Sequence, residues 1–149
     1  MDKLDSVLLA MLAENCRASL HSLSEKLGMP QTTLYSRIKK LIHKGIIKRY
    51  TIDIDYEKLG FEITAIIHII TREGKIRETA LKLSEHPNII ALYDITGEYD
   101  LLLIARFRRI KELDEFVKWL NSLETISRTV TSIVLKTVKE DHNSILRLL

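Results

Sequence analysis

One segment of this 149-residue sequence gathers cations and short polar side chains without any carboxylate. Between Lys26 and Ile52 there are seven Lys or Arg residues and no Asp or Glu, although the whole chain carries a net charge of only +3. A basic block inside an apolar-patterned segment favours a polyanion partner such as nucleic acid. The alternative is a solvated helix face, and charge alone does not distinguish the two.

The spacing of apolar residues in this segment predicts a helix from Pro30 to about Lys44, packed through Leu34, Ile38, Leu41 and Ile42. The side chains opposite this stripe are Thr32, Ser36, Lys39, Lys40 and His43. Uncharged polar groups and Arg read base edges, whereas Lys and Arg neutralise phosphates. Since a recognition helix presents its first turns to the major groove, the base-edge candidates are Gln31, Thr32, Thr33, Tyr35 and Ser36. The phosphate candidates are Arg37, Lys39, Lys40, Lys48 and Arg49.

A second group with chemical potential is the turn Thr96-Gly97-Glu98-Tyr99-Asp100. Asp100 leads directly into the apolar run Leu101–Ile104, although Asp is depleted in strands. A carboxylate at this place could pair with the ammonium of a small ligand, while the Gly97 backbone N–H could meet the ligand's carboxylate. The alternative is an ordinary hairpin turn with a solvated Asp.

Three short helices must position the basic face. Leucines at helical spacing predict a helix over residues 3–13, and Ser19 and Gly28 suit the two ends of a second helix. Pro30 suits the first turn of the third helix, and Gly45 suits its end. The strand-like sequence Ile46–Ile54 would then supply a wing. This order predicts a winged helix-turn-helix domain over residues 1–50, followed by a linker strand at 51–60.

Residues 61–149 read as a ferredoxin-like βαββαβ domain, which makes the whole fold α+β. The predicted strands are Phe61–Thr71, Ile89–Thr96, Tyr99–Phe107 and Thr129–Val138, with helices from Ile76 and Ile110. Only Gly97-Glu98 separates the middle strands, which favours a two-residue type II′ turn. Helices would cover one sheet face. The other face is also apolar, so we expect a second copy of the chain to bury it.

Several strings in this order resemble the leucine-responsive regulator/AsnC (feast/famine) family of prokaryotic transcription regulators. They are Leu4-Asp5, Arg17-Ala18-Ser19, Leu27-Gly28, Ser36-Arg37-Ile38-Lys39-Lys40-Leu41, Gly45-Ile46-Ile47, Thr96–Asp100 and Arg128–Leu135. The resemblance implies a sequence-specific regulator that binds pseudo-palindromic promoter DNA as a homodimer, tetramer or octamer. It also implies an amino-acid effector between dimers, near Gly97, Tyr99, Asp100, Thr129 and Thr131. Two departures are Pro30, where Ser is common, and the helix entry Gln31–Tyr35, which affects the preferred DNA sequence.

Two other functions remain open at this point. Haem-pathway decarboxylases resemble the same family, and a low-specificity DNA-packaging protein would share the basic face. The five histidines are scattered and none lies at metal-ligand spacing with Cys16, so we predict no catalytic residue, metal or cofactor. The single cysteine, the absence of a signal-like start and the lack of a bilayer-length apolar run favour a cytoplasmic protein with no membrane partner.

Overall fold

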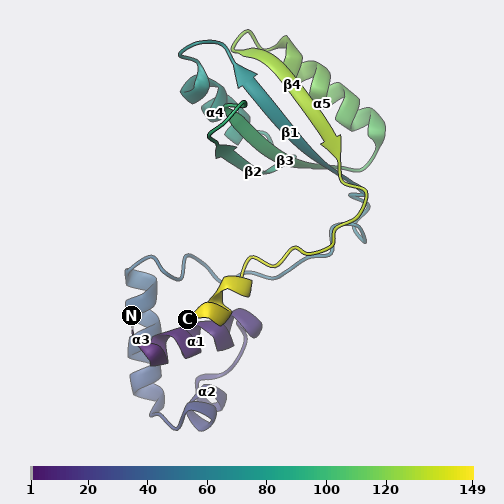
Figure 1. Ribbon diagram of the computed structural model, residues 1–149. Coiled ribbons are helices and arrows are strands. Elements are labelled where there is room, and N and C mark those ends of the chain that lie inside the picture. The colour runs from purple at the N-terminus through teal and green to yellow at the C-terminus, as the bar shows by residue number, and fades with distance from the viewer. Residues whose placement is uncertain (1) are drawn as a thin grey trace. The chain divides into compact units, whose positions relative to one another are not determined.

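The computed structural model describes residues 2–149 and divides into two compact units (Figure 1). The first unit contains the chain up to Asp53 together with Lys139–Leu149, and the second contains Ile54–Val138. The C-terminal residues therefore belong with the first unit, whereas the sequence placed them in a second domain running to residue 149. No helix in the described part of the chain has the length and apolar character needed to cross a membrane.

The first unit is built from three α-helices and a short 3-10 helix. They are α1 (Lys3–Glu14), α2 (Leu20–Leu27), α3 (Gln31–His43) and η1 (Ser144–Leu148). Asp2 and Asp5 form a capping box at the start of α1, and the Ser19 hydroxyl accepts a hydrogen bond from the Ser22 N–H at the start of α2. Gly28 ends α2 with a φ of 61°, a left-handed conformation that glycine adopts without strain. The three predicted α-helices are confirmed.

A small leucine core holds these helices together. Leu8, Leu12, Leu23 and Leu34 are buried, and Ile38 packs against them from α3. One face of each helix thus meets the others, as the sequence spacing predicted. The opposite face of α3 remains open to solvent.

Three details of the first unit differ from the sequence prediction. Pro30 caps α3 from outside instead of forming its first residue, because its ψ of 139° is not helical. Ile42, predicted to be in the packed stripe, is 45% exposed. The predicted wing at Ile46–Ile54 forms no strand, and neither does the predicted linker strand at 51–60. A strand needs a hydrogen-bonding neighbour, and no strand lies within the described residues of this unit.

The second unit has the predicted βαββαβ order. Its elements are β1 (Ile63–Thr71), α4 (Ile76–Ser84), β2 (Ile89–Asp94), β3 (Leu101–Phe107), α5 (Ile110–Ser122) and β4 (Ile126–Ile133). The strands lie in the order β2-β3-β1-β4, and all three pairs are antiparallel. The ferredoxin-like α+β prediction is confirmed.

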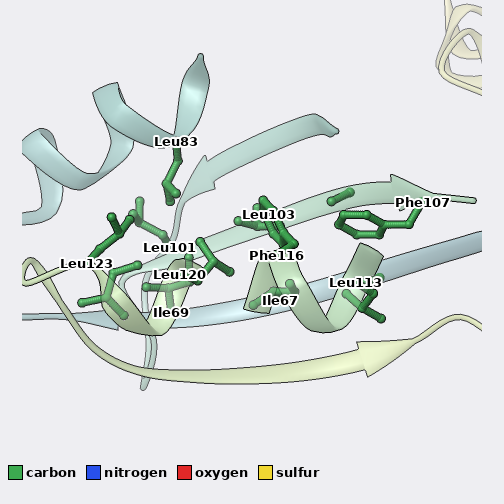
Figure 2. Packing of buried hydrophobic residues seen from close by; sticks show 13 residues of the cluster. Ile67, Ile69, Leu83, Leu101, Leu103, Phe107, Leu113, Phe116, Leu120 and Leu123 are labelled. Atoms are coloured by element: carbon green, nitrogen blue, oxygen red, sulfur yellow. The ribbon is translucent and has the colours of Figure 1, made fainter. Parts of the chain in front are cut away.

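Alternation along the strands separates a helix-facing side from an open side. Ile67 and Leu103 are fully buried and pack with Leu83 of α4 and Leu120 of α5 (Figure 2). The intervening residues point to the open side, which carries Ile66, Ile70, Leu102, Ile104 and Val130 around His68. These side chains are only half-buried. A substantial part of the sheet therefore lacks a covering layer in the single chain.

Several strand boundaries differ from the sequence prediction, among them the start of β1 at Ile63 instead of Phe61. β2 ends at Asp94 and β3 begins at Leu101, so residues 95–100 form a six-residue loop and the two-residue type II′ turn was wrong. At the base of the loop the Ile95 N–H donates to the Asp100 carbonyl, and the Asp100 N–H donates to the Ile69 carbonyl of β1. β4 covers 126–133, not 129–138: its ladder with β1 ends at the Ala65–Ile133 pair, and the Val134 N–H then donates to the Thr64 carbonyl.

Candidate nucleic-acid interface and ligand site

The exposed face of α3 brings together most of the residues predicted to contact DNA. Gln31, Thr32, Tyr35, Ser36, Lys39 and Lys40 are exposed along the helix, and Thr33 is half-buried beside them. Lys48 and Arg49 are also exposed, in the segment that follows the helix. The predicted face is thus a real surface of the first unit.

Pro30 supplies no side-chain cap to α3, so backbone groups make the first contacts of the helix. The Pro30 carbonyl accepts hydrogen bonds from the N–H groups of Thr33 and Leu34. The Gln31 amide lies 3.5 Å from the Nδ1 atom of His21 on α2. The helix start thereby keeps a contact with the preceding helix of the helix-turn-helix.

Lys39 and Tyr35 form a second local arrangement on this face. The Lys39 ammonium lies 4.9 Å from the centroid of the Tyr35 ring, a cation–π contact. The ring is half exposed, so it can hold the cation at the helix surface while leaving it accessible to phosphate.

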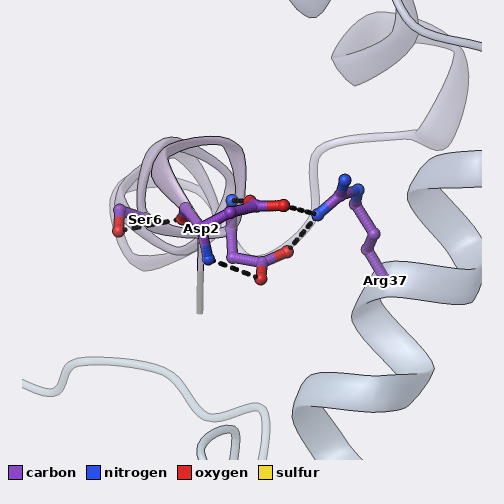
Figure 3. A network of polar contacts seen from close by, with 4 residues as sticks. Asp2, Ser6 and Arg37 are labelled. Carbon is purple, nitrogen blue, oxygen red and sulfur yellow. Dashed lines mark hydrogen bonds and ion pairs between the residues drawn. The ribbon is translucent and has the colours of Figure 1, made fainter.

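Arg37 is placed differently from the other cations. Its guanidinium bonds to Asp2, the N-cap of α1, and to Asp5 in the first turn of α1, at 2.7 Å to each carboxylate (Figure 3). These residues border a surface hollow of about 680 Å³ that Thr32, Ser36 and Lys40 also line. Sequence reasoning missed the two acidic residues. The capping-box pattern at the start of α1 could have indicated their local role, but not their partner on α3.

The ion pair shifts the proton affinities of all three groups. The pKa of Asp5 lies below its usual value, chiefly because Arg37 hydrogen-bonds to it, and the pKa of Asp2 is lowered first by the Asp5 N–H and then by Arg37. The pKa of Arg37 is raised by Asp2 and Asp5. The network is therefore ionised at neutral pH.

The candidate ligand site centres on the loop 95–100, which holds Gly97, Tyr99 and Asp100. The Asp100 Oδ2 atom accepts hydrogen bonds from the Thr71 N–H at 2.7 Å and the Thr71 hydroxyl at 2.9 Å. Thr71 is buried at the end of β1 and was missed at the sequence level because it lies 29 residues from Asp100. The carboxylate is consequently fixed through one oxygen.

Tyr99 lies against the open side of the sheet. Its ring centroid is 4.8 Å from that of His68, which pairs across the ladder with Leu102 and Val130. The loop and the open sheet face thus meet at this aromatic pair.

The two predicted threonines lie on the other side of β1 from the loop. Thr129 pairs with Ile69, whose other neighbour is Leu101 at the start of β3. The Thr129 hydroxyl donates a hydrogen bond to the Asn121 side-chain oxygen of α5, and Thr131 is exposed. Gly97, Tyr99 and Asp100 therefore lie together in one loop, whereas β1 separates Thr129 and Thr131 from β3, which follows that loop.

The histidines do not form a metal centre. Within residues 2–149 no group of three His, Cys, Asp or Glu side chains is placed to hold a metal ion. His86 packs against Phe116 and Trp119, and burial lowers its pKa. It thus has the surroundings of a core-edge residue.

Comparison with known proteins adds an independent line of support. A model of the AsnC-type helix-turn-helix domain matches residues 1–42, and a model of the Lrp/AsnC ligand binding domain matches residues 64–144. The chain is 40% identical to an uncharacterized HTH-type transcriptional regulator of Pyrococcus furiosus, over 95% of each chain. It is 35% identical to the HTH-type transcriptional regulator FL11 of Pyrococcus horikoshii, over 94% of this chain and 93% of the relative.

A solved structure covers both units. It is a transcriptional regulator of Neisseria meningitidis in complex with L-methionine, with a TM-score of 0.92 and 29% identity over 100% of this chain and 99% of that one. The two matched family models describe the same family that the short sequence motifs of the chain resemble. The relatives are named as regulators and not as enzymes.

Proposed function

The chain belongs to the Lrp/AsnC family of transcriptional regulators, and on this premise we propose that it binds specific duplex sequences through α3 and responds to an amino acid. It has a helix-turn-helix DNA-binding domain and a ligand-binding domain. The operator, the effector and the residues that contact them are the subject of the proposal. We assign no catalytic role to the chain and expect it to act in the cytoplasm.

The exposed cations of the first unit carry the DNA proposal. Lys39, Lys40, Lys48 and Arg49 form no ion pair with any carboxylate among residues 2–149. Unpaired surface cations on a projecting helix can neutralise phosphates and release the counterions condensed there. These four residues are the proposed phosphate contacts.

The first turns of α3 are proposed to read base edges. The Gln31 side-chain amide can form two hydrogen bonds with the major-groove edge of one adenine. The hydroxyls of Thr32, Thr33 and Ser36 can donate hydrogen bonds to base edges or accept them. Tyr35 adds a further hydroxyl on the same face. Arg37 is removed from the phosphate contacts because two carboxylates already hold its guanidinium.

Selection of bound duplexes from a random pool tests the DNA proposal. The full chain is expected to enrich a pseudo-palindromic sequence, because a two-fold symmetric dimer reads two half-sites. A packaging protein would enrich no consensus. Failure to retain any duplex at low salt would contradict DNA binding altogether.

The loop 95–100 is the proposed effector site. Thr71 holds Oδ2 of Asp100, so Oδ1 remains to pair with the ammonium of a free amino acid, and the Gly97 N–H can meet its carboxylate. Tyr99, Thr129 and Thr131 are further proposed contacts. The relative of Neisseria meningitidis was solved with L-methionine, which supports an amino acid as the ligand class.

Thermal shift measurements against the twenty amino acids test the effector proposal. At least one amino acid is expected to raise the unfolding midpoint of wild type, and the Asp100→Ala variant is expected to lose that shift. A wild-type protein that no amino acid stabilises would contradict it.

We further propose that a second copy covers the open face of the sheet. Ile66, Ile104 and Val130 lie on that face and are half-buried in the single chain. A self-complementary apolar face is the usual basis of a two-fold dimer. Light scattering on the purified chain tests this directly.

A further inference from the structure

Three charged side chains join α1 to α3 through a closed set of hydrogen bonds. Arg37 Nη1 donates to Asp2 Oδ2 and to Asp5 Oδ1, both at 2.7 Å (Figure 3). The Asp5 N–H donates to Asp2 Oδ1, and the Asp2 N–H donates to Asp5 Oδ2. Each of the four carboxylate oxygens therefore accepts one hydrogen bond within the network.

This arrangement couples the cap of one helix to the side chain of another. Each carboxylate uses one oxygen for the capping box of α1 and the other for Arg37. An amide at either position could not replace it, because an amide offers one acceptor and one donor group. Loss of either carboxylate would therefore weaken both the cap of α1 and the bridge to α3.

The network is partly shielded from water. The Arg37 side chain is 29% exposed and that of Asp5 is 15% exposed, whereas that of Asp2 is 54% exposed. Ion pairs in such surroundings are screened less by salt than exposed pairs. Charge-assisted hydrogen bonds also have defined directions. By contrast, the leucine contacts between α1 and α3 are non-directional and leave helix rotation less restricted.

We propose that Asp2, Asp5 and Arg37 form a strut that sets the orientation of α3 on α1, with Arg37 acting as a positioning residue instead of a phosphate contact. The DNA consequences rest on the proposed function, whereas the strut itself does not. Arg37 lies on α3 between Ser36 and Lys39, so a small rotation of the helix would displace the proposed base and phosphate contacts on the same turns.

Amide hydrogen exchange on the full chain tests the strut without DNA. The Arg37→Met variant keeps an unbranched apolar stem but removes every donor, and Asp5→Asn removes one acceptor. Both variants are expected to speed exchange in α1 and α3 roughly tenfold while leaving the strands of the second unit unchanged. Glu14→Gln is the matched control, since Glu14 lies on α1 with no ion pair among the described residues.

The double variant Asp5→Asn/Arg37→Met sharpens this test. If the two residues act through one bond network, the double variant should exchange about as fast as either single variant. Fully multiplicative effects would contradict the strut. Unchanged exchange in both single variants would contradict it as well.

Salt titration of duplex binding tests the assignment of Arg37, with the duplex selected from the random pool as the probe. Arg37→Met should weaken binding several-fold without changing the slope of affinity against salt, whereas Lys39→Met should reduce that slope by about one. Asp5→Asn should also weaken binding, although it removes a negative charge beside the DNA face.

Two outcomes would overturn the assignment. They are a slope reduced by about one in Arg37→Met, and a gain of affinity in Asp5→Asn. If wild type retains no duplex, the proposed function fails, while the exchange measurements still decide whether the strut exists.

Discussion

The two units of this chain handle charge in opposite ways. On α3 of the first unit Lys39 and Lys40 lie exposed, whereas Arg37 is half-buried and held by two carboxylates. In the second unit Asp100, the carboxylate with a proposed ligand role, is already fixed by two hydrogen bonds from Thr71. Binding of a long polyanion is strengthened by several accessible cations that neutralise its phosphates. Binding of a small ligand is strengthened when the group that contacts it is held in place before binding.

The units also differ in how their apolar surface is used. The first unit packs a few leucines between three helices, and its open face is polar. The second unit has a larger core on one side of its sheet and half-buried aliphatic side chains on the other. This difference agrees with the proposal that the first unit contacts DNA and the second unit self-associates.

The largest expected effect is loss of the proposed dimer after a single substitution in the second unit. Replacing Ile104 by Lys puts a charge at the centre of the open sheet face, where a second copy would have to desolvate it. The dimer should dissociate at least a hundredfold more readily, as measured by sedimentation at several concentrations. Lys82→Ala on α4 is the control, and a dimer that survives Ile104→Lys would place the subunit contact elsewhere.

The next largest expected effect is weaker DNA binding after substitutions in the first unit. Removing two phosphate contacts in Lys39→Ala/Lys40→Ala should reduce the salt slope by roughly two and affinity at 0.1 M salt on the order of fifty-fold. All duplex sequences should be affected similarly. Two exposed cations of the second unit, changed in Lys82→Ala/Lys136→Ala, form the control. A full slope in the α3 variant would exclude those lysines from the interface.

A smaller effect tests the fixed carboxylate. Thr71→Val removes one of the two hydrogen bonds to Asp100, so the effective amino acid should bind roughly tenfold more weakly, while duplex affinity without effector stays the same. Thr71→Ser keeps the hydroxyl and should behave like wild type. Calorimetric titration measures both. Equal affinity in all three proteins would show that the Thr71 hydroxyl does not orient Asp100.

The smallest effect concerns the strut and acid. Because the folded-state pKa of Asp5 lies below 3.8, its ionisation stabilises the first unit above that pH, and the contribution is lost as pH falls through the folded value. The difference in α1 exchange stability between wild type and Asp5→Asn should therefore be full at pH 5 and shrink below pH 3.8. A difference independent of pH would contradict an ionic contribution.

Local sequence patterns predicted the helices and the order of helices and strands along the second unit. The leucines of α1 recur at helical spacing, and Ser19 and Gly28 mark the ends of α2, so short-range signals were sufficient there. The wing failed because Ile46–Ile54 has strand-like composition but no ladder partner in its own unit. Composition indicates a strand only when a neighbour exists to pair with it.

The polar details of both sites depend on long-range contacts. Arg37 was predicted as a phosphate contact from the charge pattern, but its partner Asp2 lies 35 residues away on another helix. The hydrogen bonds that Thr71 donates to the Asp100 carboxylate likewise join residues 29 positions apart, so they cannot be read from neighbouring residues. The sequence therefore identified the candidate side chains. The tertiary structure shows which of them already have hydrogen-bonding partners within the chain.

A DNA footprint of the full chain, with and without amino acids, tests the central claim most directly. Protection should appear as discrete half-sites spaced about one helical turn apart, and one amino acid should change its strength or extent. Uniform coverage of the fragment, or no protection even at low salt, would contradict a sequence-specific regulator that reads DNA through α3.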